Sequence, residues 1–432
     1  MDHLGLDLGT TTISAAVLDA DGRLLCTRTV PGGAAVAGQP WERKQDASGI
    51  ECTALSLLDG LLQEFPDIGC VGLTGQMHGI VYVDAAGQLL SPLYTWQDET
   101  GAQPGPDGKS TAARLTARTG YPLASGYGLV TLACHQAAGT IPNGAAAVCT
   151  IADYLAMRLS GRSAPCLTPS MAASLGLFDG TGFDREAVRR AGLPERLLPE
   201  VSEEAELGGG RLRVFAALGD NQASFLGAGQ GRLDAPLINI GTGSQFSFFT
   251  KEHRTVPGLE TRPFPGGWLL TGAPLCGGRS FALLERFFRQ TAELVTGTPC
   301  PSAYPAMLRA LEAPMPDDVP QFRTTFAGTR QDPAERAVLS GLDEENFAPV
   351  PLLHALLRGM ADELSACYRA ALKAGCAPAG RLLGSGNGLR RNPALQRAVE
   401  RSFGLPLTLA AVPEEAACGA ALFTRMQHEA AL

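Results

Sequence analysis

The sequence predicts an α/β protein built from two domains, and three observations lead to this prediction. The chain has 432 residues, which is more than one hydrophobic core usually organises. A strand, glycine turn and second strand occur near the N-terminus and again after residue 236, so one half of the chain resembles the other. Stretches with strand and helix periodicity alternate in both halves.

The first half begins with a predicted β-meander. The stretch "LGLDLGTTTISAAVLDADGRLL" contains three apolar segments separated by a glycine turn and by a second turn at Asp21-Gly22. A helix pattern over 51–64 then precedes a strand in "CVGLTGQMHGIVYV". We place the domain boundary after the acidic and glycine-rich "SEEAELGGGRL", which gives domains of residues 1–213 and 214–432.

The second half repeats the hairpin in "APLINIGTGSQFSFFTKE", with its turn at 241–243. Residues 351–375 show the strongest helix pattern of the chain, and Gly375 ends it. The strand "RLLGSG" and the helix pattern "NPALQRAVERSFG" follow as a strand-loop-helix unit.

Composition excludes several classes of partner. Hydrophobic residues make up 45% of the chain and charged residues 18%, and no apolar run is long enough to span a bilayer. The net charge of −8 argues against a nucleic-acid surface. The eleven cysteines are scattered without a CxxC pair, and the N-terminus lacks the features of a secretory signal. We therefore expect a cytoplasmic protein with no membrane or nucleic-acid partner.

The hairpin "DLGTTT" is a candidate phosphate site. Its glycine permits a tight turn with positive φ, and the amides and hydroxyls of Thr10, Thr11 and Thr12 can then converge on phosphate oxygens. Asp7, at the strand end, is placed to hold a hydrated Mg²⁺. An ordinary hairpin is the alternative. The second loop, "NIGTGSQ", favours the phosphate interpretation because two facing hairpins can hold a polyphosphate.

Two other glycine-rich segments are not standard nucleotide motifs. "GPDGKS" at 105–110 lacks the first glycine of a P-loop and follows no strand, so it is interpreted as a surface loop. "GSGNGL" at 384–389 has Leu389 where a dinucleotide fingerprint needs glycine. Its glycines allow close approach of a base or ribose, which indicates an adenosine pocket.

Asp220 in "VFAALGDNQASFLGAG" is the candidate general base. A buried strand ends at Gly219, and the next helix begins at Asp220, so a helix N-cap is the alternative role. A helix N-terminus favours an ionised carboxylate, and such a group can accept the proton of an alcohol that attacks a phosphoryl group.

Two further segments are too polar for their surroundings. "GLTGQMHG" contains Gln76 and His78, and "TWQD" contains Trp96, Gln97 and Asp98. A core histidine and a core aromatic residue are the alternatives. Together these groups offer hydroxyl-binding atoms and one flat apolar face, as in a polyol site.

These motifs, in this order, resemble the FGGY carbohydrate kinases over nearly the whole chain, together with "TIADYLAMRLSG" and the closing "PEEAACGAAL". "GQMHG", "TWQD" and "MAASLGLFD" are most similar to the sedoheptulokinases, with xylulokinases next. The resemblance implies two actin-like ATPase (ribonuclease H-like) domains with a catalytic cleft between them, each domain holding a mixed five-stranded sheet. It also implies an ATP- and Mg²⁺-dependent enzyme that phosphorylates a terminal hydroxyl of a ketose, in particular sedoheptulose.

The resemblance also implies roles by position. The N-terminal domain would supply sugar binding and the first phosphate loop, and the C-terminal domain the base, the second phosphate loop and the adenosine pocket. The implied residues are Asp7 and Asp220 for the metal; Gly9, Thr10, Thr11, Thr12, Gly241, Thr242 and Gly243 for phosphate; Gly384, Ser385, Gly386 and Asn387 for adenosine; Gln76, Met77, His78, Trp96, Asp98, Asp220 and Asn221 for the sugar; and Asp220 as catalytic base.

The chain departs from the family pattern at "AGTRQDP" (327–333), where many relatives carry a glutamate and "RTP", and it is shorter than many of them. The shorter length leaves oligomer contacts open, with a homodimer as one option. A xylulokinase or other pentulose kinase is the alternative function. A non-catalytic sugar sensor would lose the base, and a nucleotide switch would lose the polyol group. Small residues at 124–128 would leave room for a longer sugar.

Overall fold

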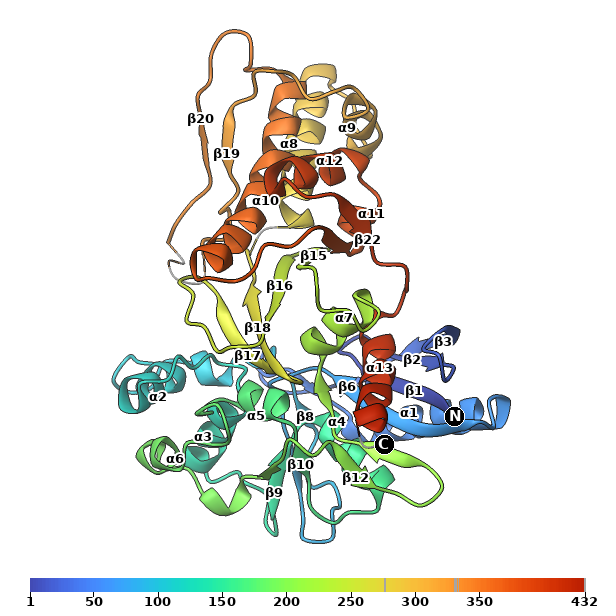
Figure 1. Cartoon of the computed structure of the whole chain (residues 1–432). Coiled ribbons are helices and arrows are strands. Elements are labelled where there is room, and N and C mark those ends of the chain that lie inside the picture. Colours follow the sequence, from blue (N-terminus) through green and yellow to red (C-terminus); the bar gives the residue numbers. More distant parts are fainter. Residues whose placement is uncertain (276, 330–331, 333, 431–432) are drawn as a thin grey trace. The chain divides into compact units, whose positions relative to one another are not determined.

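The computed structural model describes residues 1–275, 277–329, 332 and 334–430. The chain divides into two compact units. The first unit contains residues 1–231 and 412–432, and the second contains residues 232–411. Figure 1 shows both units, with the elements labelled.

The first unit is built on a sheet of seven strands in the described residues, with the order β12-β13-β6-β1-β2-β3 and with β14 also paired to β6. Its strands are β1 (Asp2–Leu8), β2 (Thr12–Leu18), β3 (Leu24–Pro31), β6 (Ile68–Gly75), β12 (Glu206–Gly208), β13 (Arg213–Phe215) and β14 (Leu218–Gly219). Smaller sheets are formed by β4 (Ala35–Val36), β5 (Lys44–Gln45) and β8 (Leu93–Tyr94), by β7 (Val81–Val83) and β9 (Ala147–Cys149), and by β10 (Cys166–Leu167) and β11 (Glu200–Val201).

The helices of the first unit include one from the C-terminal end of the chain. They are α1 (Ala47–Glu64), α2 (Thr111–Thr119), α3 (Gly128–Ala138), α4 (Ile151–Ser160), α5 (Pro169–Leu175), α6 (Arg185–Ala191), α7 (Asp220–Ala228) and α13 (Glu415–Ala430), with short 3₁₀ turns at Thr100–Ala102 and Glu195–Leu197. None of the helices in the described part of the chain combines the length and apolar composition needed to cross a bilayer.

Close packing of small residues explains why the C-terminal helix belongs to the first unit. A Cβ on Gly5 of β1 would lie 1.9 Å from the carbonyl oxygen of Ala417. A Cβ on Gly419 would lie 1.8 Å from the carbonyl oxygen of Ala223 in α7. Only glycine allows backbones to approach so closely. Helix α13 therefore packs directly on β1 and α7.

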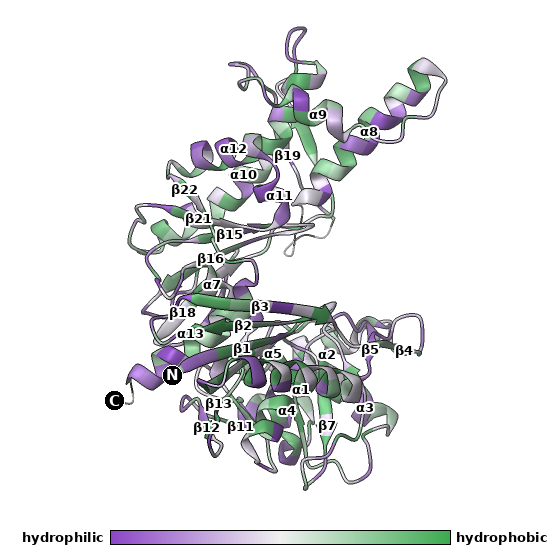
Figure 2. Ribbon diagram, turned by 90° about the vertical axis from the view of Figure 1, so that its right-hand side faces the viewer, coloured by the Kyte–Doolittle hydropathy of each residue, from purple (hydrophilic) through white to green (hydrophobic). Residues whose placement is uncertain are grey.

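The second unit has a six-stranded sheet in the described residues, with the order β17-β18-β16-β15-β21-β22. Its strands are β15 (Leu237–Ile240), β16 (Ser244–Thr250), β17 (Glu260–Phe264), β18 (Gly267–Gly272), β21 (Leu382–Ser385) and β22 (Leu407–Leu409), with a separate pair, β19 (Gln321–Arg323) and β20 (Val338–Ser340). Its helices are α8 (Gly278–Thr296), α9 (Tyr304–Ala310), α10 (Pro349–Lys373), α11 (Asn387–Arg390) and α12 (Pro393–Phe403). Hydrophilic and hydrophobic residues alternate along α8 (Figure 2).

Two expectations about the architecture differ from the structure. The sheets have more than five strands, because β12 and β14 extend the first sheet and β17 extends the second. The expected boundary after residue 213 lies inside the first unit, since β13 and β14 both pair with β6. The acidic, glycine-rich stretch that precedes this boundary contains β12. Because β12 pairs with β13 in an antiparallel arrangement, the stretch is not a linker.

Candidate active site

Three parallel strands of the first unit end at the same edge of its sheet. Leu8 at the end of β1 is paired with Gly75 of β6, and Gly75 is paired with Gly219 of β14. The segments that follow carry the candidate residues 9–12, 76–78 and 220. Ligands of α/β sheets bind at the carboxyl ends of the strands, so this edge is the natural place for a site.

Asp7 lies within a group of acids at this edge. It is paired across the sheet with Ser14 and Thr74, and its Oδ1 is buried without a hydrogen-bond partner in the described residues. Burial, together with the nearby carboxylates of Asp220 and Glu414, raises the pKa of Asp7 to about 7. Both charges that act on Asp7 are negative, as expected of a place that receives a cation.

The first glycine hairpin is held by side chains. Gln45 Nε2 donates to the carbonyl oxygen of Thr10 at 2.7 Å, and Trp96 Nε1 donates to Thr10 Oγ1 at 3.0 Å. The side chains of Thr11 and Thr12 are exposed. The prediction that Gly9 has a positive φ is wrong. Glycine is required there because a Cβ would lie 2.9 Å from the carbonyl oxygen of Thr12.

Gln76 connects the second segment to this hairpin. Its backbone N–H donates to the carbonyl oxygen of Leu8 at 3.0 Å, and its Nε2 donates to Gln45 Oε1 at 2.9 Å. Gln76 Oε1 is buried without a partner in the described part of the chain. A continuous chain of hydrogen bonds therefore runs from Gln76 through Gln45 to Thr10.

Met77 and His78 complete this segment. A Cβ on Gly219 would lie 2.8 Å from Met77 Sδ, so Met77 packs beside the residue that precedes Asp220. His78 has φ of 74°, donates from Nδ1 to the carbonyl oxygen of Ser174 at 2.6 Å, and stacks on Tyr127 at 4.7 Å between ring centroids. Positive φ in a non-glycine residue is costly and is concentrated at functional sites.

Trp96 and Asp98 differ in exposure. The Trp96 side chain is 46% exposed and offers a flat surface, whereas Asp98 is 2% exposed. The Asp98 carboxylate accepts the backbone N–H of Arg43 at 3.0 Å and that of Thr100 at 2.9 Å. Asp98 thus braces the loop that carries Trp96.

Asp220 is the first residue of α7, and Gly219 is the N-cap. The N-cap alternative for Asp220 is therefore wrong. The carboxylate is partly exposed and accepts the N–H of Asn221 at 2.6 Å. The helix N-terminus favours its ionised form. Asn221, next in the chain, is buried.

Two of the small residues at 124–128, Gly126 and Gly128, are closely packed, whereas Ala124 is exposed. A Cβ on Gly126 would lie 1.8 Å from the carbonyl oxygen of Trp96, and one on Gly128 would lie 2.5 Å from Ile80. Ser125 Oγ donates to the carbonyl oxygen of Asp98 at 3.0 Å. The glycines here serve the packing of the Trp96 loop, and room for a longer sugar beside Ala124 stays a prediction.

The remaining candidates form a second group, in the second unit. The loop Gly241–Gly243 joins β15 to β16 and is held by backbone hydrogen bonds, from Gly278 N–H to Gly241 O at 2.8 Å and from Arg279 N–H to Thr242 O at 3.0 Å. A Cβ on Gly243 would meet no atom within 4 Å, so a ligand can approach the loop closely.

The expected adenosine loop lies beside that loop because β21 is parallel to β15 and Ser385 is paired with Asn239. Gly386 has φ of 87° and is the N-cap of α11, whose first residue is Asn387. A Cβ on Gly386 would lie 2.5 Å from the carbonyl oxygen of Ile240. Gly384 and Ser385 end β21, and Ser385 Oγ is buried without a partner among the described residues.

Comparison with known proteins decides the family. The FGGY family of carbohydrate kinases matches with its N-terminal domain over residues 3–230 and with its C-terminal domain over residues 237–428. The chain belongs to the FGGY family of carbohydrate kinases. It is accordingly an ATP-dependent enzyme that acts on a small-molecule sugar, and its fold is the two-domain actin-like ATPase fold.

Individual relatives of this FGGY kinase cover almost its full length. It is 28% identical to the sedoheptulokinase of Mus musculus, over 97% of this chain and 96% of the relative. It is 26% identical to a xylulose kinase of Streptomyces coelicolor, over 97% of this chain and 86% of the relative. The crystal structure of xylulose kinase from Rhodospirillum rubrum is similar with a TM-score of 0.80 and 23% identity, over 98% of this chain and 89% of that one.

Two residues near the candidate site of the kinase escaped the sequence analysis. Gln45 lies in the two-residue strand β5, and Glu414 lies just before α13, far from Asp7 in sequence. The only feature of the sequence that could have indicated a role for Gln45 is the run of polar residues "KQD" in a stretch without regular periodicity. The segment 327–333, where the chain departs from the family pattern, lies partly outside the described residues, since 330, 331 and 333 are not described.

Proposed function

We propose that this kinase transfers the γ-phosphoryl group of ATP to a terminal hydroxyl of a ketose, with sedoheptulose as substrate and D-xylulose as the alternative. The names of the relatives support both sugars, and the mouse sedoheptulokinase is matched over nearly its whole length. The observation that carries the proposal is the shared edge of β1, β6 and β14, where Asp7 lies near the end of β1 and Gln76–His78 and Asp220 directly follow the ends of β6 and β14.

In this mechanism Asp220 accepts the proton of the attacking hydroxyl. The carboxylate is partly exposed and therefore accessible, and it lies at a helix N-terminus, which favours negative charge. A phosphoryl-transfer transition state has little bond formation to the nucleophile, so correct placement of the base matters more than high basicity. Gln76, His78, Trp96 and Asn221 orient the sugar, with Met77 and Asp98 supporting them.

The two glycine hairpins bind the phosphates of ATP in this proposal. Backbone N–H groups of Gly9–Thr12 and Gly241–Gly243 donate to phosphate oxygens, and such preorganised donors stabilise charge that develops during transfer. The loop at Gly384–Asn387 holds the adenosine.

The acids of the first unit fit a Mg²⁺ ion. Asp7 Oδ1, which is buried without a hydrogen-bond partner in the described residues, and the carboxylates that raise the pKa of Asp7 form a set of oxygen donors. No group of three or more potential ligands in the described residues could hold a metal alone. Mg²⁺ usually binds one or two carboxylates together with waters and substrate phosphates, so Asp7 and Asp220 suffice. When bound, the ion would neutralise charge on the β- and γ-phosphates.

Release of ADP from ATP in the presence of different sugars tests this function. We expect a ketose to give the highest kcat/KM in a panel of sedoheptulose, D-xylulose, L-ribulose, L-rhamnulose, gluconate and glycerol. We expect sedoheptulose to exceed D-xylulose by about 10 to 200-fold, the usual effect of one or two additional contacts. Glycerol or gluconate as best substrate would overturn the ketose proposal, and D-xylulose in first place would overturn only the choice of sugar.

We also propose a cytoplasmic location and a homodimer. The scattered cysteines favour a reducing compartment. Phe287, Leu294 and Val295 on α8 are exposed at 54%, 84% and 78%, and an apolar face of this kind favours self-association.

A further inference from the structure

A pocket of about 250 Å³ lies in the second unit, apart from both loops assigned to ATP. Arg397 and Arg401 of α12 and His354 of α10 line it, and the chain that follows α9 closes it with Glu312, Pro314 and Met315. The proposed chemistry uses none of these residues.

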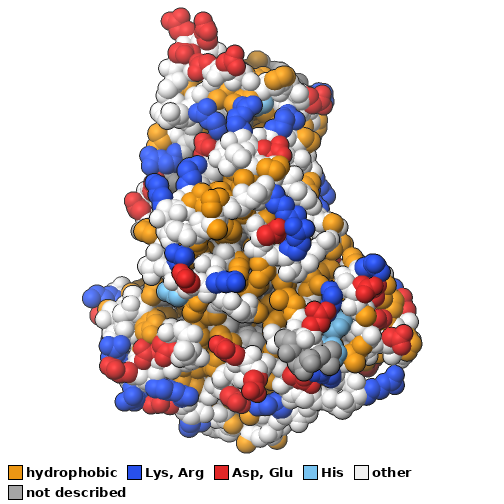
Figure 3. All heavy atoms as spheres, in the orientation of Figure 1, with side chains coloured by type: hydrophobic (Ala, Val, Ile, Leu, Met, Phe, Trp, Pro, Cys, Tyr) orange, Lys and Arg blue, Asp and Glu red, His pale blue; other side chains and the backbone are white. Residues whose placement is uncertain are grey.

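The two arginines line the same pocket. They are four residues apart on α12 and so lie on one face of the helix. Arg397 Nη2 donates to the carbonyl oxygen of Leu311 at 3.0 Å, and Arg401 Nη1 donates to Met315 Sδ at 3.4 Å. A guanidinium carries five N–H donors, so most remain available. Figure 3 shows basic side chains gathered on the face over α12.

His354 adds a buried nitrogen without a partner. The residue is 5% exposed, and its Nε2 has no hydrogen-bond partner in the part of the chain that the structure describes. Burial lowers the pKa of His354, and Arg397 and Arg401 lower it further, so the ring is neutral at pH 7. In the tautomer with hydrogen on Nε2, the ring carries a donor without an acceptor in the wall of the pocket. A buried donor of this kind needs an acceptor.

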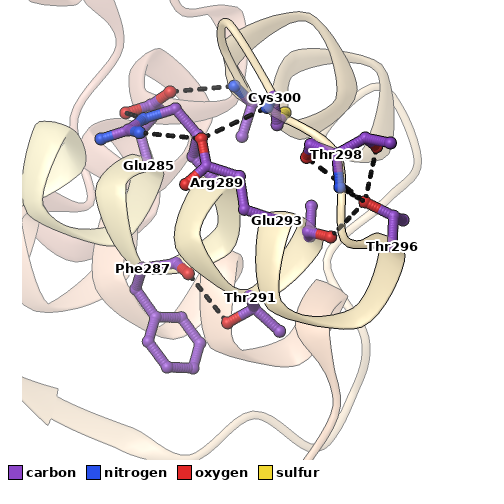
Figure 4. A network of polar contacts seen from close by, with 10 residues as sticks. Glu285, Phe287, Arg289, Thr291, Glu293, Thr296, Thr298 and Cys300 are labelled. Carbon is purple, nitrogen blue, oxygen red and sulfur yellow. Dashed lines mark hydrogen bonds and ion pairs between the residues drawn. The ribbon is translucent and has the colours of Figure 1, made fainter.

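The lining residues Glu312, Pro314 and Met315 follow a segment that is held to α8 by hydrogen bonds. Glu285 Oε1 of α8 accepts the N–H of Ala303 at 2.9 Å, just before α9. Glu293 Oε1 accepts the N–H of Cys300 at 3.2 Å and an N–H of Arg289 at 3.3 Å (Figure 4). Glu312 is exposed and is the one carboxylate among the lining residues. The balance of charge in the pocket is therefore positive.

We propose that this pocket binds the phosphoryl group of a small phosphate compound between Arg397, Arg401 and His354. Arginine pairs hold phosphate through several charge-assisted hydrogen bonds, and an imidazole N–H supplies one more. The volume lies below the range of drug-sized sites, which excludes a whole nucleotide and favours inorganic phosphate or a short phosphate monoester.

Calorimetric titration of the full chain with inorganic phosphate at constant ionic strength tests the proposal. The variant is Arg397→Gln with Arg401→Gln. The matched control is Arg185→Gln with Arg189→Gln, an exposed pair at the same spacing on α6. The ATP loops contribute equally in all three proteins. We expect the wild type and the control to show a binding event that weakens about tenfold or more in the variant, because two charged donors are lost. Equal phosphate isotherms in wild type and variant would overturn the proposal.

Two further measurements guard against a misfolded variant. His354→Leu keeps both arginines and should also weaken phosphate binding, with thermal unfolding near that of the wild type. Crystals soaked in tungstate, a tetrahedral dianion, should show density within hydrogen-bond reach of both arginines, and tungstate bound only elsewhere would contradict the assignment.

Titrations with glycerol 3-phosphate and with citrate identify the class of ligand. Tighter binding of the phosphate ester than of inorganic phosphate indicates a phosphorylated metabolite. Binding of citrate but not of phosphate would overturn the proposal that the pocket binds a phosphoryl group.

Discussion

The two glycine hairpins share a backbone plan but differ in what holds them. In the first unit β1 lies between antiparallel β2 and parallel β6, and in the second unit β15 lies between antiparallel β16 and parallel β21. One backbone N–H, that of Gly32, donates to the carbonyl oxygen of Thr11 in the first hairpin at 2.8 Å, and the side chains of Gln45 and Trp96 add further support. Backbone N–H groups of Gly278 and Arg279 support the second.

The charged residues differ as well. Asp7 stands two residues before the first glycine, and Asn239 stands at the same position before Gly241. The carboxylates of Asp7, Asp220 and Glu414 interact within the first unit. This comparison agrees with our proposal that the first unit carries the acid chemistry of transfer and that the second unit binds the nucleotide. Each prediction below tests one part of this division.

Replacing the proposed base should have the largest effect. Asp220→Asn keeps a polar residue at the start of α7, so we expect an intact fold. Turnover should fall by about 100-fold or more, the usual contribution of a general base, while ATP still binds. Steady-state ADP release and nucleotide titration measure the two properties. Turnover near that of the wild type would remove Asp220 from the mechanism.

Asp7→Asn introduces into the first hairpin the asparagine that the second hairpin has at the equivalent position, Asn239. Because a buried, poorly compensated carboxylate is lost, we expect unchanged or higher thermal stability. We expect the rate to fall about tenfold or more and the Mg²⁺ concentration for half-maximal rate to rise, with sugar KM unchanged, since the acid acts on the metal. Asp59→Asn, an exposed acid on α1, is the control. Unchanged metal dependence would make "DLGTTT" an ordinary hairpin.

Gly278→Ala tests the backbone support of the second hairpin. The added Cβ would lie 2.5 Å from the carbonyl oxygen of Gly241, so the loop must move. We expect ADP affinity to fall by about tenfold, because misplacement of fixed donors is costly, while sugar affinity stays the same. Gly380→Ala is the control, since its Cβ would meet no atom within 4 Å. An equal loss of sugar affinity would argue against a nucleotide role for this loop.

The local sequence pattern was sufficient to predict the two repeated hairpins, because a glycine turn between two apolar strands is specified within a few residues. The helix expected over 51–64 is α1 (Ala47–Glu64), and the one over 351–375 is α10 (Pro349–Lys373). Features that depend on contacts between residues far apart in the sequence could not be predicted from the sequence. The return of α13 to the first unit depends on the close packing of Gly5 against Ala417, and the pKa of Asp7 depends on burial and on the carboxylates of Asp220 and Glu414. Gly9 was assigned a positive φ because turn glycines often have one, whereas close approach is the reason here.

The last and smallest effect should come from Gln45, a positioning residue that the sequence analysis missed. Gln45→Leu has similar volume but removes the donors to the carbonyl oxygens of Thr10 and Gly33 and the acceptor for Gln76 Nε2. Leaving buried polar groups unpaired costs about 1–3 kcal/mol each, so we expect some loss of thermal stability and a drop of about five- to tenfold in kcat/KM.

The pattern of kinetic change separates positioning from a merely structural role. Gln45 links the sugar segment to the phosphate hairpin, so KM for sugar and KM for ATP should both rise in Gln45→Leu. Gln45→Glu keeps an acceptor for Gln76 but cannot donate to Thr10, so we expect it to restore sugar KM and not ATP KM. Gln63→Leu, an exposed residue of α1, controls for the added apolar surface. A variant that loses stability but keeps both KM values would show that side-chain support of the first hairpin serves the fold alone.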